Sequence, residues 1–434
     1  MFQKITRRNK EVTGVMLIFS LFFLLGGFGT AAPAEIAAGL KTIVTSPAQL
    51  TCDYFALAGM GATYVNAGLV GLACIAVLLL SGFQMNHLSL MAFFLTTGFS
   101  FFGMNILNIW PCILGTWLFS RVAKTPFSAQ TNFALFATAL TPFVSEALCR
   151  YPVFDGMAYA MVGRIILAII LGVVCGFLLP ILCKHGPNLH KGYSLYNAAS
   201  VAGFIAIVLF GIMFRGTGHE IPTNTDIGES HGTVVLVFSA VMSVLMIVAG
   251  FLLNGKSFKG YKAVITATGH SCDFTNIANA PLTMVNIGIF GLFTTAYYLI
   301  TGAAFTAPTA GSIICLLAIA PCGAHVLNML PIMIGYAIAS TFGAFELSTQ
   351  AIIVGLCFAG AMIPVSGRFG SLCGIAAGMI HALIVTTVVT FHGGFCLYNG
   401  GFTCAVTVIF LLPILEYFFE PQDKLHLLPR RKKS

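Results

Sequence analysis

Two acidic residues in this very apolar sequence have the type and spacing to do chemistry. Asp53, in Thr51-Cys52-Asp53-Tyr54, and Asp273, in Ser271-Cys272-Asp273-Phe274, lie 220 positions apart in matching segments. A carboxylate within a membrane is costly, so by default it indicates a functional role such as ion coupling or part of a solute pathway. The same carboxylate could instead cap a half-helix by accepting backbone N–H bonds. Both roles stay open, and we expect the two residues to be equivalent.

Four asparagines repeat at the same spacing. Asn66 and Asn286 follow the acidic segments in Val65-Asn66-Ala67-Gly68 and Val285-Asn286-Ile287-Gly288, and Asn108 and Asn328 come later in both halves. Such uncharged amides suit a neutral polar solute or a partly dehydrated ion. They equally suit hydrogen bonds between membrane helices, which are worth only about 0.5–2 kcal/mol.

Each later asparagine precedes a proline in a matching run. Asn108 and Pro111 correspond to Asn328 and Pro331, and because proline removes a backbone donor, we predict an interrupted helix in both halves. His325 stands where the first half has Asn105, and a histidine can titrate near neutrality. The candidate residues of a substrate or ion pathway are Asp53, Asp273, Asn66, Asn286, Asn108, Asn328 and His325.

The end of each half repeats in a second register. His190 and Asn197 match His392 and Asn399 at a spacing of 202 positions. Both histidines stand where an apolar run begins, so we expect them in solvated or interfacial positions.

Composition decides the class of protein. Of the 434 residues, 58% are hydrophobic and 8% are charged, against roughly a quarter charged in soluble domains, so the chain is a polytopic membrane protein. The thirteen cysteines show no CxxC pair and no zinc spacing, which predicts neither a disulfide framework nor a metal or other cofactor. The expected partners are the lipid bilayer, a small solute or ion, and a second copy of the chain in a homo-oligomer.

Charge placement predicts orientation. The basic residues gather at the two ends, around Lys4 and Lys432, which indicates cytoplasmic termini in the inner membrane and not a nucleic-acid partner. The repeats span 1–218 and 233–434, joined by an extracytoplasmic linker over 219–232. We expect the first apolar run, about 13–32, to be a retained span and not a cleaved signal.

An inside N-terminus and an outside linker require an odd number of crossings in the first half. Two such halves are oppositely oriented, which gives inverted repeats. The predicted fold is therefore an all-α membrane protein with about 10–14 spans, including broken or re-entrant half-helices.

Two resemblances add to this interpretation. The segment Val65–Gly71 resembles the Asn-Gly helix start of urea transporters, a likeness that implies a pore near Asn66 and Asn286. The second signature of that family, Leu-Pro-x-x-Thr-x-Pro-Phe, survives at most as Thr141-Pro142-Phe143 in the first half and as Ile363-Pro364-Val365 in the second. Over its whole length the chain resembles an uncharacterised bacterial membrane family catalogued as a domain of unknown function, with Asn105–Pro111 as the distinctive run.

The leading functional hypothesis is a channel or secondary transporter for a small polar solute or ion, with the pathway at the interface of the repeats. No phosphate loop occurs in the sequence. An intramembrane enzyme acting on a lipid-linked substrate is the alternative, yet HExxH and GxSxG motifs are absent from the sequence, so we expect no enzyme. A non-transporting assembly subunit is the third possibility.

Overall fold

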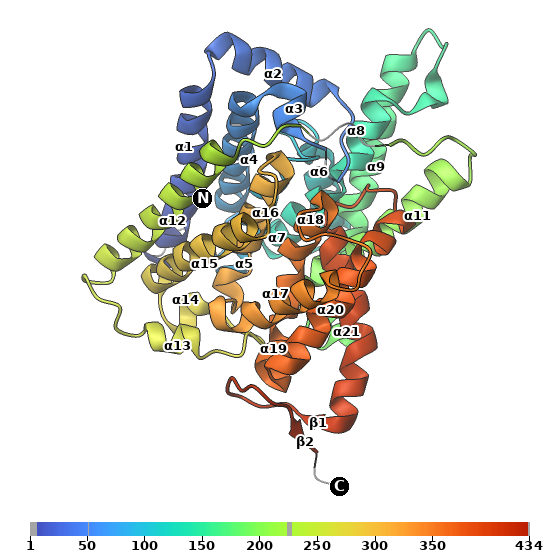
Figure 1. Ribbon diagram of the computed structural model, residues 1–434. Coiled ribbons are helices and arrows are strands. Elements are labelled where there is room, and N and C mark those ends of the chain that lie inside the picture. Colours follow the sequence, from blue (N-terminus) through green and yellow to red (C-terminus); the bar gives the residue numbers. More distant parts are fainter. Residues whose placement is uncertain (1–6, 51, 224–227, 433–434) are drawn as a thin grey trace.

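The computed structural model describes residues 7–50, 52–223 and 228–432. Within them, ten helices are long and apolar enough to cross a membrane, and the chain is an all-α polytopic membrane protein (Figure 1). The first run is one of the ten, as a helix over Asn9–Thr30. Thr51, Asp226 and the terminal Lys4 lie outside the described residues.

Each half contains five of these spans and two shorter helices between its second and third spans. The first half contains α1 Arg7–Thr30, α2 Pro33–Thr45, α3 Tyr54–Ala58, α4 Met60–Leu80, α5 His87–Phe99, α6 Ile109–Val122, α7 Thr131–Ala137, α8 Thr141–Cys149, α9 Ala160–Cys183, α10 Gly186–His190 and α11 Asn197–Phe210. The second contains α12 Gly232–Leu253, α13 Tyr261–Ile265, α14 Phe274–Ile277, α15 Ala280–Ile300, α16 Ala307–Leu317, α17 Val326–Ser340, α18 Gln350–Ala359, α19 Ile363–Phe369, α20 Ser371–Val388 and α21 Asn399–Phe418. Two short strands, β1 Phe419–Glu420 and β2 Arg430–Arg431, pair after α21.

Contacts between the halves establish that they run in opposite directions. Asp53 lies before α4 and contacts the first residue of α16, whereas Asp273 lies before α15 and contacts the first residue of α5. Asp53 precedes α4, and the partner of Asp273 begins α5, which follows α4. The two contacts therefore lie at opposite ends of α4, whose 21 residues rise about 30 Å. We call these ends the Asp53 face and the Asp273 face. Helix α4 runs from the first to the second, and its equivalent α15 runs back.

The short helices form re-entrant hairpins. Helix α5 starts on the Asp273 face, and α6 returns alongside α9 until the Lys184 ammonium lies 5.9 Å from the Phe119 ring. The loop that follows α9 is held on the Asp273 face by His270 Nε2, 3.1 Å from the carbonyl oxygen of Lys191. The second hairpin, α16 and α17, enters from the Asp53 face in the same way. An irregular backbone at such depth is tolerated because it is buried in protein.

The two hairpins cross at α5 and α16, near the centre of the molecule (Figure 1). Small residues let the backbones meet: a Cβ on Gly98 would lie 2.7 Å from the Gly311 carbonyl oxygen, and one on Gly311 would lie 2.5 Å from that of Gly98. Glycine at such a crossing permits close approach of two helices.

The interruption predicted from the prolines is present in both halves, but it lies before each proline. Residues 100–108 and 318–325 separate the paired helices. Pro111 is the third residue of α6, where the backbone N–H has no intrahelical acceptor, and Pro331 lies inside α17. Proline is tolerated in a first turn for that reason, so Pro111 helps the helix restart and does not cause the break.

Candidate functional site

Asp53 lies at the start of two helices from different repeats. Its Oδ1 accepts hydrogen bonds from the backbone N–H groups of Phe55 in α3, at 2.9 Å, and of Ala307 in α16, at 3.2 Å. Its Oδ2 accepts one from Gly228 N, at 2.9 Å, in the linker. The residue is 2% exposed. A carboxylate at two helix N-termini is stabilised by the orphan N–H groups and by the positive end of each helix dipole.

Asp273 occupies the equivalent place on the other face, where it is more exposed to solvent. It caps α14 by accepting from Thr275 N, at 2.9 Å, and accepts from Asn276 Nδ2 at 2.8 Å. Its Oδ2 also lies 2.9 Å from His87 Nδ1, and its side chain is 17% exposed. The two aspartates thus occupy equivalent positions, as the sequence predicts, but they differ in exposure and in the groups that they bind.

Both aspartates contact the hairpin of the other repeat, but only Asp53 caps it. Asp53 belongs to the first repeat and accepts from the first backbone N–H of α16 in the second. Asp273 belongs to the second repeat and lies against the side chain of His87, the first residue of α5, whose N-cap is Asn86. His87 and Ala307 are themselves 220 positions apart. Each aspartate therefore fastens the entrance of the hairpin of the other half.

Asn66 and Asn286 fasten the hairpin tips from the neighbouring span. Asn66 Nδ2 donates to the carbonyl oxygens of Ser100, at 2.9 Å, and Met104, at 3.0 Å. Asn286 Nδ2 donates to the carbonyl oxygens of residues 320 and 324, the positions 220 further on. Both asparagines are buried, and these bonds satisfy carbonyl groups that the end of a helix leaves without partners.

Asn108 and Asn328 close the same turns from within. Asn108 Nδ2 donates to the Gly103 carbonyl oxygen at 3.1 Å, and Asn328 Nδ2 donates to that of Gly323 at 2.9 Å. His325 also binds at a tip, where its Nε2 lies 2.9 Å from the carbonyl oxygen of Ala267. Asn105 holds the same position in the first hairpin and donates to the Ile43 carbonyl oxygen.

These contacts favour the structural role for the candidate residues. All four asparagines bind backbone carbonyls at the helix breaks, and both aspartates accept backbone N–H bonds at helix starts. Their side chains are divided between the two faces and the two tips. Their role in a pathway stays a prediction.

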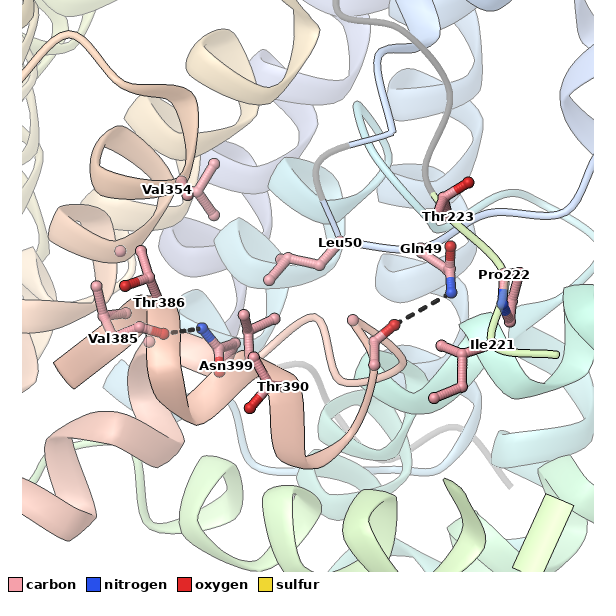
Figure 2. Close-up of a pocket in the computed structure, with 16 residues that line it drawn as sticks. Gln49, Leu50, Ile221, Pro222, Thr223, Val354, Val385, Thr386, Thr390 and Asn399 are labelled. Atoms are coloured by element: carbon pink, nitrogen blue, oxygen red, sulfur yellow. Dashed lines mark hydrogen bonds between the residues drawn. The ribbon is translucent and has the colours of Figure 1, made fainter. Parts of the chain in front are cut away.

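A cavity of about 350 Å³ opens on the Asp53 face, where the first repeat and the linker meet α18, α20 and α21 (Figure 2). Polar groups on its wall include Gln49, Thr386, Thr390 and Asn399, and the apolar part includes Leu50, Val354 and Val385. Gln49 Nε2 donates to the Gly393 carbonyl oxygen at 3.1 Å, which leaves its amide oxygen turned toward the side of Thr223 (Figure 2). None of the lining residues that the structure describes is charged.

A cavity of about 170 Å³ is partly equivalent to this one. It lies between α5, α7 and the start of α11, and Asn197 lines it as Asn399 lines the larger one. Tyr196 and Tyr398 line the smaller cavity, and the ring centroid of Tyr196 lies 5.7 Å from that of Phe358 and 6.2 Å from that of Tyr398. Aromatic rings therefore pack where the repeats meet.

The predicted solvation of His190 and His392 is wrong. Both are buried, at 2% and 0% exposure. His190 Nε2 lies 3.1 Å from Asn197 Oδ1, and His392 Nε2 lies 3.0 Å from Asn399 Oδ1. Burial lowers the pKa of His392 to about 4 and also lowers the pKa of His190. The loops carrying them fold inward because Leu195 N and Leu397 N donate to carbonyls of the opposite repeat, at residues 361 and 139.

His381, inside span α20, escaped the sequence reasoning. It is fully buried, its Nδ1 lies 2.6 Å from the Tyr336 hydroxyl, and its Nε2 lies 2.8 Å from the carbonyl oxygen of Gly400. Gly400 also lines the larger cavity. The available signal was an ionisable residue within an apolar run, which marks a functional hypothesis by itself. Gln49 and Thr386 gave no comparable signal.

Comparison with known proteins yields a family and no activity. A family model described as "Protein of unknown function (DUF1576)" matches residues 32–215 and 239–417. Neither the curated proteins nor the solved structures include a significant match. These comparisons add nothing to the resemblance between Val65–Gly71 and urea transporters. Since the family match covers most of both halves, the chain belongs to the DUF1576 family.

Proposed function

We propose that the protein is a secondary transporter for a small, uncharged polar solute. The observation that carries the proposal is the pair of re-entrant hairpins that enter from opposite faces and cross at Gly98 and Gly311. In inverted-repeat transporters, interrupted helices near the midplane form the solute site, and the repeats rock about it.

The larger cavity supports the class of solute. Its volume of about 350 Å³ falls at the lower end of ligand pockets, which hold roughly 300–1,000 Å³. Gln49 and Thr386 offer hydrogen-bonding groups on a wall whose described residues are all uncharged. Moving an ion from water into such surroundings costs desolvation free energy, which no opposite charge among the described lining residues would offset. A neutral solute with an apolar part and one or two polar groups fits this wall better.

The pair of cavities supports a transporter over an open channel. The cavities border equivalent residues, Asn399 and Asn197, and differ about twofold in volume, 350 against 170 Å³. Tyr196 and Tyr398 line the smaller cavity and pack against Phe358. Two inverted halves that exchange conformations would exchange the larger and the smaller cavity.

Charge supports the orientation that the sequence predicts. Lys256, Lys259 and Lys262 follow α12 on the Asp273 face. The described chain ends are on that face too: Asn9 Oδ1 accepts from Met85 N beside α5, and Glu416 pairs with Lys191. Because cytoplasmic loops carry the excess of Lys and Arg, we propose that the Asp273 face is cytoplasmic.

The test is solute flux into proteoliposomes. Wild-type protein should admit one or more small neutral solutes, among urea, glycerol, short amides and zwitterionic amino acids, faster than protein-free vesicles do. Thr386→Val should slow that flux, whereas Thr387→Val, a neighbouring exposed threonine outside the cavity wall, should not. Absence of flux for every neutral solute and ion tested would refute transport, and flux of ions alone would refute the solute class.

A further inference from the structure

The chain has only two tryptophans, and both lie on one exposed face of α6. Trp110 and Trp117 are 44% and 42% exposed, with Leu114 between them at 42%. They line a groove of about 470 Å³ that Phe127 and Ile169 complete. We call it the tryptophan groove. Its wall is almost wholly apolar, as expected of a surface that meets lipid chains.

A cationic pocket follows the groove at the end of the same helix. Ser120, Arg121, Lys124, Thr125 and Pro126 surround a volume of about 400 Å³, which we call the basic pocket. The Arg121 guanidinium carbon lies 6.0 Å from the centre of the Trp117 ring, so a cation–π contact holds it at the junction. Among the described residues, Arg121 and Lys124 form none of the ion pairs with acidic side chains.

Cations at a helix C-terminus also stabilise the helix itself, so charge alone does not indicate a ligand. The second repeat separates the two explanations. The positions 220 residues after Trp110, Trp117, Arg121 and Lys124 hold Leu330, Ala337, Thr341 and Ala344. The equivalent helix α17 forms without tryptophan or a cationic end, so the fold does not require these residues.

The dimensions fit one leaflet of a bilayer. Eleven residues separate Trp110 from Arg121, a rise of about 17 Å along the helix. Half of a hydrocarbon core is about 15 Å thick. The basic pocket is on the Asp273 face, beside Lys184 at the end of α9. A molecule with an anionic head in that pocket would thus extend its chain along the groove.

We propose that this face of α6 binds an anionic phospholipid, with the phosphate between Arg121 and Lys124 and one acyl chain in the tryptophan groove. The Thr125 hydroxyl accepts from Gln130 Nε2, so its own O–H can donate to the headgroup, whereas the buried Ser120 hydroxyl donates to the Trp117 carbonyl oxygen. Each basic residue near a membrane surface adds about 1 kcal/mol of attraction to anionic lipid. Two residues together correspond to a preference of roughly thirtyfold over a zwitterionic lipid at low salt.

Tryptophan quenching tests the proposal directly, because the reporter residues are the site. The full-length protein is reconstituted in vesicles that contain a small fraction of phosphatidylglycerol or phosphatidylcholine with brominated chains. Brominated phosphatidylglycerol should quench at a severalfold lower mole fraction than brominated phosphatidylcholine. The double variant Arg121→Gln/Lys124→Gln should lose that difference, and Lys256→Gln/Lys259→Gln, on the same face, should keep it.

Two further arms separate other occupants. Millimolar inorganic phosphate or glycerol phosphate should leave quenching by brominated phosphatidylglycerol unchanged. If either one relieves the quenching, the basic pocket binds a free phosphate and not a lipid headgroup. Equal quenching by the two brominated lipids would overturn the proposal. Weak quenching by both, with a cross-linked dimer through α6, would assign the face to a second copy. If the double variant fails to fold, the single variant Lys124→Gln is measured instead, and it should reduce the preference for brominated phosphatidylglycerol. The preference of the wild-type protein should also fall as the salt concentration rises, and a preference that neither change reduces would overturn the proposal.

Discussion

Removing the Asp53 carboxylate should destabilise the protein strongly. Asp53 accepts four backbone hydrogen bonds of 2.9 to 3.4 Å, from Phe55, Ala56, Gly228 and Ala307. The bonds from Phe55 and Ala307 are fully buried. An unsatisfied buried donor costs about 1–3 kcal/mol. With these two stranded, we expect Asp53→Ala to lower the free energy of unfolding by roughly 3–5 kcal/mol.

The assay is thermal unfolding of the purified protein in detergent. Each kcal/mol shifts Tm by about 2–4 °C in proteins of 150–250 residues and by about half of that in a chain of 434 residues, so we expect Asp53→Ala to melt roughly 3–10 °C below wild type. Asp53→Asn should lie between the two, because its amide oxygen can still accept while its NH₂ group opposes Gly228 N. Asp273→Ala is the matched control. Its carboxylate is 17% exposed and water can replace it, so about 1 kcal/mol should be lost.

A wild-type Tm for Asp53→Ala would refute the capping account. A wild-type Tm for Asp53→Asn, together with loss of solute flux, would show that the carboxylate acts in the pathway. Equal losses at Asp53 and Asp273 would show that burial does not distinguish the two caps.

Three further predictions concern the hairpins and loops. Gly98→Val should prevent the α5–α16 crossing and abolish recovery of monodisperse protein, because its Cβ would meet Gly311, whereas Gly14→Ala, with nothing within 4 Å, should be recovered as wild type. Asn286→Ala should lower Tm as Asp53→Ala does, by stranding two carbonyls at the second tip. Burial holds the pKa of His392 at about 4, against about 6.5 in the unfolded chain, so the unfolded state binds the proton first as the pH falls. The free energy of unfolding should therefore be highest above pH 6.5 and fall by about 3 kcal/mol between pH 6.5 and 4. A free energy of unfolding in urea that does not change over this pH range would contradict the prediction.

Much of the fold was predictable because the duplication repeats each local device. The 220-residue register linked Asn66 with Asn286 and Asp53 with Asp273, and both pairs occupy equivalent places. Opposed orientation followed from the position of charges alone. These inferences succeeded because the positions of charges and of repeated motifs can be read directly from the linear sequence.

The exchange between halves was not predictable. Nothing in the sequence around Asp53 indicates that it caps a helix 254 residues away. His190 and His392 stand at the ends of apolar runs, where solvation is common, and are buried because their loops fold into the other repeat. Gln49 and Thr386 share a cavity only through tertiary packing. Local sequence patterns carry no information about such partners.

The contacts between the repeats also bear on how such a chain arose. A single repeat would lack the aspartate that contacts the entrance of its hairpin. The loop before its last span would also lack the carbonyl that accepts from Leu195 or Leu397. An ancestor encoded by one repeat would have needed a second copy inserted upside down in the same membrane to supply them. Fusion of two such genes would fix the antiparallel pairing and leave each copy free to differ, as the two repeats do at His325 and at the tryptophans of α6.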